Sequence, residues 1–218
     1  MTQKNILEQL GTKGADIDAV VAQLMRGRNL ISLVVDALQI EKSSKKYACE
    51  KVLRCVSEKS PELIYPYFNV FTELLDSDNS FLKWGAIMTI ANLTAVDSQN
   101  RFEDIFMKYY APIKGPALVT AANIIGSSVK IVHAKPMLAD SITREILKVE
   151  KANFLHKGVP SPECRNVAIG QAIDAFDGFF DLIGLKTKVI NFIKRQLANT
   201  RNQVVKKAER FMRHHTGS

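Results

Sequence analysis

The sequence lacks long apolar runs and any secretion signal. No stretch of 18 apolar residues occurs among its 218 residues, and the N-terminal MTQKNILEQL has no uninterrupted apolar core of the kind found in signal peptides. The three cysteines, Cys49, Cys55 and Cys164, form no metal-binding or redox motif. We therefore expect reduced thiols, no membrane partner and a cytoplasmic protein.

Motifs for catalysis are also missing. There is no Gly-rich phosphate loop, no nucleophile elbow and no Cys/His pair. Asp174 and Asp177 lie three apart on a predicted helix, and we expect them to be solvated acids rather than a general base. The four histidines lack the spacing of metal ligands. They are His133, His156, His214 and His215, and the last two are expected to lie at a frayed terminus. The sequence thus predicts no catalytic residue, metal site or cofactor, and favours a non-enzyme.

The apolar residues recur at helical spacing along the whole chain, with no alternating run long enough to indicate a strand. The clearest unit covers residues 61–93, where an amphipathic helix, a turn at 76–79 and a second helix follow one another. Pro66 removes one backbone hydrogen bond and is expected to bend the first helix. Asn79 or Ser80 is expected to cap the second helix.

A similar helical hairpin recurs along the sequence. Second helices are predicted to begin near residues 44, 80, 116, 162 and 201, at steps of 36, 36, 46 and 39. The longest connection, residues 153–163, contains two prolines and a glycine that forbid a continuous helix. Periods of roughly 40 residues with two helices each are typical of α-solenoids. A compact bundle is the competing architecture, but short turns at a steady period favour stacked repeats.

The unit at 61–93 resembles the HEAT repeat family. Its hairpins carry a proline in the first helix, an acidic turn, a basic residue early in the second helix and then a small residue, here Pro66, Asp76 with Asp78, Lys83 and Ala86. The resemblance implies an all-α, armadillo-like α-α superhelix of about five stacked hairpins, right-handed, with inner helices along a concave groove. We expect residues 1–218 to form a single domain, with 1–28 as its N-terminal cap and 186–218 as a basic C-terminal hairpin.

Positive charge is concentrated in that last hairpin. Residues 1–185 contain 21 Lys and Arg against 21 Asp and Glu, whereas residues 186–218 contain nine against one. Such a face can neutralise phosphates. The candidate residues are Lys194, Arg195, Lys206, Lys207, Arg210 and Arg213. The alternative, which we favour, is the polar outer face that a terminal repeat requires.

Two further residues are candidate binding groups. Trp84, the only tryptophan, can stack on a base or a cation, although Tyr47 aligns with it one repeat earlier and favours a packing role. Arg165 and Asn166 follow the long connection and can face a ligand, although a cap or hydrogen bond between repeats is the favoured interpretation.

The sequence favours a non-enzymatic scaffold that binds a protein or peptide on its solenoid surface. The alternative is nucleic-acid binding through the basic C-terminal face. Small HEAT-like alkylpurine DNA glycosylases are similar in length, helical build and basic charge, but the aromatic and acidic residues of their groove have no matching positions here. In a third interpretation, a partner binds through residues 153–163. Oligomeric state is not predicted.

Overall fold

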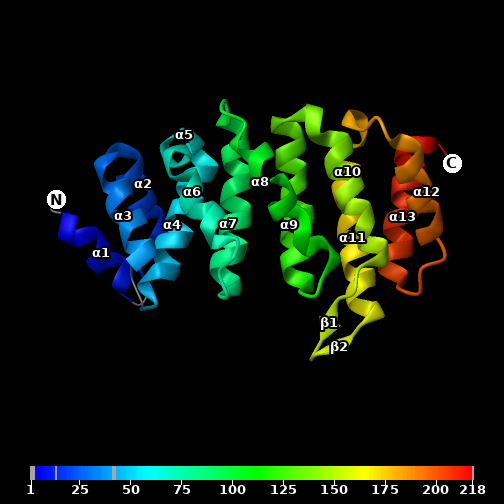
Figure 1. The fold of residues 1–218 in the computed structure, drawn as a ribbon, viewed down its shortest axis with the longest axis horizontal. Coiled ribbons are helices and arrows are strands. Elements are labelled where there is room, and N and C mark those ends of the chain that lie inside the picture. Colours follow the sequence, from blue (N-terminus) through cyan, green and yellow to red (C-terminus); the bar gives the residue numbers. More distant parts are fainter. Residues whose placement is uncertain (1–2, 13, 41–42, 218) are drawn as a thin grey trace. The chain divides into compact units, whose positions relative to one another are not determined.

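A computed structural model describes residues 3–12, 14–40 and 43–217 (Figure 1). The helices divide into two compact units, residues 1–105 and 106–218, and the boundary falls within α8 (Arg101–Tyr110). Each unit is built from antiparallel helical hairpins that pack side by side. The predicted all-α, HEAT-like and armadillo-like repeat fold is confirmed by these hairpins.

Unit 1 (residues 1–105) has two N-terminal helices followed by two hairpins. Its elements are α1 (Gln3–Gly11), α2 (Ile17–Arg26), α3 (Asn29–Ile40), α4 (Lys45–Lys59), α5 (Pro61–Ile64), the 3-10 turn η1 (Tyr65–Tyr67), α6 (Phe68–Leu74), α7 (Ser80–Leu93) and η2 (Thr94–Val96). Helix α4 packs against α2, α3 and α7, so apolar side chains on several of its sides are buried. Residues 1–2 and 13 of the predicted N-terminal cap lie outside the described residues.

Local sequence signals shape the second hairpin of unit 1. The 3-10 turn η1 contains Pro66 and separates α5 from α6, which confirms the predicted bend. The Asn79 side-chain oxygen accepts hydrogen bonds from the backbone N–H groups of Phe81 and Leu82, at 3.1 and 3.3 Å, which confirms the predicted cap. Helix α7 is apolar on most sides, as expected for a helix with neighbours around it.

Unit 2 (residues 106–218) repeats the hairpin arrangement. Its elements after α8 are η3 (Ala111–Lys114), α9 (Leu118–Ala134), η4 (Pro136–Leu138), α10 (Ala139–Leu147), η5 (Lys148–Lys151), β1 (Leu155–His156), β2 (Val159–Pro160), α11 (Pro162–Phe179), η6 (Phe180–Leu182), α12 (Lys186–Gln196) and α13 (Asn202–Thr216). Helix α11 packs between α9 and α13 (Figure 1). Across both units, each second helix begins within two residues of its predicted start.

The long connection before α11 forms a short β-hairpin, so the expectation of no strands is wrong here. Strands β1 and β2 pair antiparallel, with Leu155 opposite Pro160. Lys157 and Gly158 between them both have positive φ, at 52° and 81°, as a two-residue type I′ turn requires. Strands of two residues are too short for alternation to reveal. The predicted break in the helix is confirmed.

Two other expectations concern cysteines and membranes. Cys49 is buried, Cys55 and Cys164 are half-buried, and none of the three forms a disulfide bond with another described residue. Within the described part of the chain, the helices lack the combination of length and apolar character that crossing a bilayer requires.

Candidate binding groove

A groove of about 550 Å³ lies between α4 and α7 of unit 1. Each helix contributes side chains at positions i, i+3, i+4 and i+7, which share one helical face. The lining residues are Tyr47, Glu50, Lys51 and Arg54 of α4, Phe81, Trp84, Gly85 and Met88 of α7, and Asn79 of the preceding turn.

Three aromatic rings form one wall of the groove. The Tyr47 and Phe81 rings meet edge to face with centroids 6.3 Å apart, and Phe81 meets Trp84 in the same way at 5.4 Å. Phe81 is 68% exposed, an unusual state for a phenylalanine beside two other rings. The wall is therefore an exposed aromatic surface held on two packed helices.

The floor of the groove depends on a glycine. Glu50 points from α4 toward α7, and its carboxylate lies directly against Gly85. A Cβ atom at position 85 would overlap that carboxylate, so only glycine leaves room for it. Gly85 thereby permits the two helices to enclose an acidic residue that is only 7% exposed.

Burial dominates the electrostatics of Glu50. Desolvation raises the pKa of its carboxyl above the ordinary value, because the charged form loses water contacts. Arg54 opposes this effect by donating from Nε to the Glu50 carboxylate at 3.1 Å, and Lys51 contributes a weaker attraction. The charged groups that remain toward solvent in the groove are thus the cations Lys51 and Arg54.

Asn79 connects the two walls. Its side-chain oxygen caps α7, and its side-chain nitrogen donates to the Tyr47 hydroxyl at 2.7 Å. Lys46 Nζ lies over the Tyr47 ring, 5.6 Å from its centroid. Tyr47 is therefore contacted both at its hydroxyl and over its ring.

Of the groove residues, sequence reasoning identified Trp84 and noted Tyr47. It missed Phe81, Glu50 and Gly85. The signal available was the matching i, i+3, i+4, i+7 pattern on both helices, with aromatic residues at its N-terminal positions. The periodicity indicated the buried apolar side of α4 and of α7, but the residues on the exposed side of these helices were not predicted to form a site.

The residues that open α11 are placed differently. Asn166 donates to the Thr200 hydroxyl at 3.0 Å and accepts from the Asn199 amide at 3.2 Å, so the favoured hydrogen bond between repeats is confirmed for Asn166. Arg165 is half-buried in the first turn of α11, and its binding role stays a prediction.

The basic C-terminal hairpin is partly neutralised by acids on neighbouring helices. Arg195 makes two hydrogen bonds to Glu150, each 2.8 Å long, which raise the pKa of its guanidinium. Lys207 and Arg210 pair with Asp174, and Arg201 pairs with Glu163. Lys194, Lys206 and Arg213 are exposed, and no ion pair joins them to another described residue. The predicted phosphate-binding face therefore has three open cations, and its function stays a prediction.

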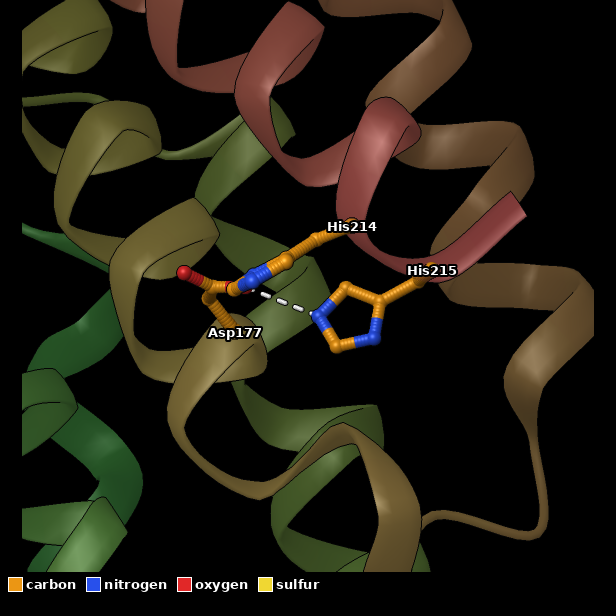
Figure 2. Close-up of side chains that lie close together, drawn as sticks. All are labelled: Asp177, His214 and His215. Carbon is orange, nitrogen blue, oxygen red and sulfur yellow. Dashed lines mark hydrogen bonds and ion pairs between the residues drawn. The ribbon is translucent and has the colours of Figure 1, made fainter. Parts of the chain in front are cut away.

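Two expectations about this hairpin are wrong. Asp174 and Asp177 are not simply solvated acids, because both contact basic side chains of α13. His214 and His215 are not frayed, since α13 continues to Thr216 and His215 packs against aromatic rings. Asp177, His214 and His215 converge on one point (Figure 2).

Two solved structures are similar to this chain along most of its length. The designed armadillo repeat protein YIII(Dq)4CqI aligns with 97% of this chain and 98% of its own, at 14% identity and a TM-score of 0.48. The designed armadillo repeat protein YIII(Dq.V1)4CPAF, solved in complex with peptide (KR)4, aligns with the same shares at 13% identity and a TM-score of 0.49. The sequence matches no protein-family model and no curated protein.

Proposed function

We propose that this protein is a binding scaffold that recognises a segment of a protein or peptide in the groove between α4 and α7. The observation that carries the proposal is the wall formed by Tyr47, Phe81 and Trp84, which leaves an aromatic surface exposed on two helices that pack together. Aromatic side chains in such positions dominate the binding energy of many protein interfaces.

The groove selects for a particular chemistry. Its exposed wall is mostly apolar, so it accommodates an aliphatic or aromatic side chain of the partner. Glu50 is buried and already paired with Arg54, whereas Lys51 is exposed at the edge. We therefore expect a partner segment in which an apolar anchor lies beside an aspartate or glutamate.

Trp84 allows this proposal to be tested directly, because it is the only tryptophan in the chain. Peptides selected from a random-sequence display library against the whole protein are expected to share an apolar anchor next to an acidic residue. Titration of such a peptide is expected to shift the emission of Trp84.

A matched pair of variants locates the site. Phe81→Ala removes an exposed ring and is expected to weaken peptide binding at least tenfold, or by about 1.4 kcal/mol or more. Met137→Ala removes another exposed apolar side chain, from η4, and should leave binding unchanged. Equal affinity of Phe81→Ala and the unmodified protein, or constant Trp84 emission, would contradict the proposal.

A second candidate function is nucleic-acid binding through the basic C-terminal hairpin. Its support is the set of exposed cations Lys194, Lys206 and Arg213. Against it, ion pairs occupy Arg195, Arg201, Lys207 and Arg210 of the same hairpin. Among the described residues, the exposed aromatic side chains are Tyr47 and Phe81, which lie in unit 1, in the groove already described.

A further inference from the structure

We propose that Asp177, His214 and His215 form a binding site for a divalent transition metal ion. Asp177 projects from α11, and the two histidines project from the last turn of α13 toward it (Figure 2). This site lies in unit 2, so it is separate in kind and place from the peptide groove of unit 1.

The three ligand atoms are close to the separation that one metal ion requires. Nε2 of His215 lies 2.8 Å from Oδ1 of Asp177, and Nδ1 of His214 lies 3.5 Å from the same oxygen. All three atoms lie within 4.8 Å of one another. Bonds of about 2.0–2.1 Å in a tetrahedral zinc site place ligand atoms about 3.3 Å apart. Small side-chain rotations therefore suffice to bring all three onto one ion.

Packing holds His215 in place before any metal binds. The His215 ring lies against Phe180 and Phe211, with ring centroids 4.5 Å away in each case, and its side chain is only 16% exposed. Phe180 and Phe211 also contact each other edge to face. His215 and Asp177 thus form a fixed pair, because neighbouring side chains restrict the rotation of the imidazole.

His214 is the ligand whose side chain can change its orientation. Its side chain is 72% exposed, so it can turn toward the metal without disturbing the core, and the metal can enter from the same side. Three protein ligands leave at least one coordination position for water, as in zinc sites with an open position.

A neighbouring cation orients the aspartate rather than blocking it. Nη2 of Arg210 lies 3.7 Å from Oδ2 of Asp177, the oxygen that does not face the histidines. The same nitrogen is 2.9 Å from Asp174, and Lys207 pairs with Asp174 as well. Asp174 therefore offsets part of the positive charge of Arg210 and Lys207, and Arg210 helps to keep Oδ1 directed at the imidazoles.

The ligand set indicates which ions fit. Two imidazole nitrogens and one carboxylate oxygen suit Zn²⁺, Co²⁺, Ni²⁺ or Cu²⁺, whereas Ca²⁺ and Mg²⁺ prefer oxygen ligands only. A bound ion would join α11 to α13 and so stabilise the C-terminal hairpin.

Calorimetric titration of the whole, chelator-treated protein with ZnCl₂ tests the site. We expect one ion per chain, with affinity reduced at least tenfold in His214→Ala and in Asp177→Asn. His156→Ala, which removes a histidine from β1 instead, is the matched control and should bind Zn²⁺ as the unmodified protein does. Binding of Co²⁺ is expected to give visible bands of nitrogen and oxygen coordination without a thiolate charge-transfer band.

The proposal is overturned if the unmodified protein binds no Zn²⁺, if His214→Ala binds it equally well, or if the Co²⁺ spectrum shows thiolate ligands. Because His214 is so exposed, His214→Ala remains a valid test even where Asp177→Asn disturbs folding. Circular dichroism of each variant checks that the helices are intact.

Discussion

Two carboxylates, Glu50 and Asp177, lie between packed helices but have different surroundings. Glu50 is almost fully buried, with Arg54 as its hydrogen-bond partner, and burial raises the pKa of its carboxyl. Asp177 is more exposed and lies among Arg210, His214 and His215. Burial therefore disfavours the charged form of Glu50, whereas the contacts of Asp177 are one guanidinium and two imidazoles.

The Glu50 carboxyl makes stability depend on pH. Because its pKa in the folded protein is above the ordinary 4.5, the folded state holds the proton to higher pH than the unfolded chain. The stability contributed by neutral Glu50 is fully present below about pH 4.5 and is lost as the pH rises through the raised pKa. Urea denaturation from pH 4 to 8 should therefore show Glu50→Gln gaining stability relative to the unmodified protein as pH rises.

Glu62→Gln, at an exposed position of α5, is the control for the pH experiment. A stability difference between Glu50→Gln and the unmodified protein that stays constant over the whole range would show that burial does not govern the charge of Glu50.

Single residues were predictable from sequence where their role is local. Asn79 as a cap and Pro66 as a bend follow from chemistry within a few residues of each. The pairing of His215 with Asp177 joins positions 38 apart, and no spacing rule for metal ligands covers two adjacent histidines with a distant aspartate. Their convergence depends on how α11 packs against α13, which periodicity does not specify.

At the level of elements, the contact between α4 and α7 determines the groove. The helices approach closely where Gly85 faces Glu50, and the aromatic wall lies along the same line of contact. Gly85→Ala forces the carboxylate to move from a packed position. We expect a loss of about 1–3 kcal/mol in the free energy of unfolding, as for overpacked cores, together with weaker peptide binding.

Gly126→Ala provides the comparison for Gly85→Ala. Gly126 is an exposed glycine within α9, and an added Cβ meets nothing within 4 Å. Alanine there should stabilise the helix by about 0.5–1 kcal/mol. Thermal or urea denaturation measures both changes, and the double variant with Glu50→Ala should recover part of the loss at Gly85. Equal effects of the two glycine replacements would contradict the proposed close contact.

Element boundaries were largely predictable because caps, prolines and turns are local signals. The hairpin of β1 and β2 was not, since it depends on a turn in which Lys157 adopts a positive φ that favours Asn or Gly. Its base is anchored by backbone hydrogen bonds from Asn153 to Lys114 and from Leu155 to Pro116, contacts that are distant in sequence.

For the whole molecule, the excess of nine cations over one acid within residues 186–218 overstates the cationic surface of the C-terminal hairpin. Four of the nine cations in residues 186–218 are held in ion pairs by acids on other helices or turns.

The repeat period was sufficient to predict the all-α hairpin fold, because a period specifies which elements recur. The division into two compact units was not visible in it, and the single domain predicted for residues 1–218 stays a prediction.

The charge balance predicts weak nucleic-acid binding. We expect no gel-shift complex with DNA or RNA at about 0.15 M salt, where surface charges are strongly screened. A complex that persists there and is weakened by Lys206→Ala with Arg213→Ala would support the second candidate function instead. In that case the double variant should reduce the slope of log K against the logarithm of the salt concentration by about two. Absence of any gel shift even at low salt would exclude nucleic-acid binding.

The side chain of Asn79 serves helix α7 and the groove at once. Aspartate at this position would still cap α7, and its second carboxylate oxygen could accept from the Tyr47 hydroxyl, whereas serine has a single side-chain oxygen and cannot make both contacts. Substitutions that are interchangeable at an ordinary helix start are therefore not equivalent here. In related chains, position 79 and position 47 should vary together, so the two would appear as a coevolving pair despite lying 32 residues apart.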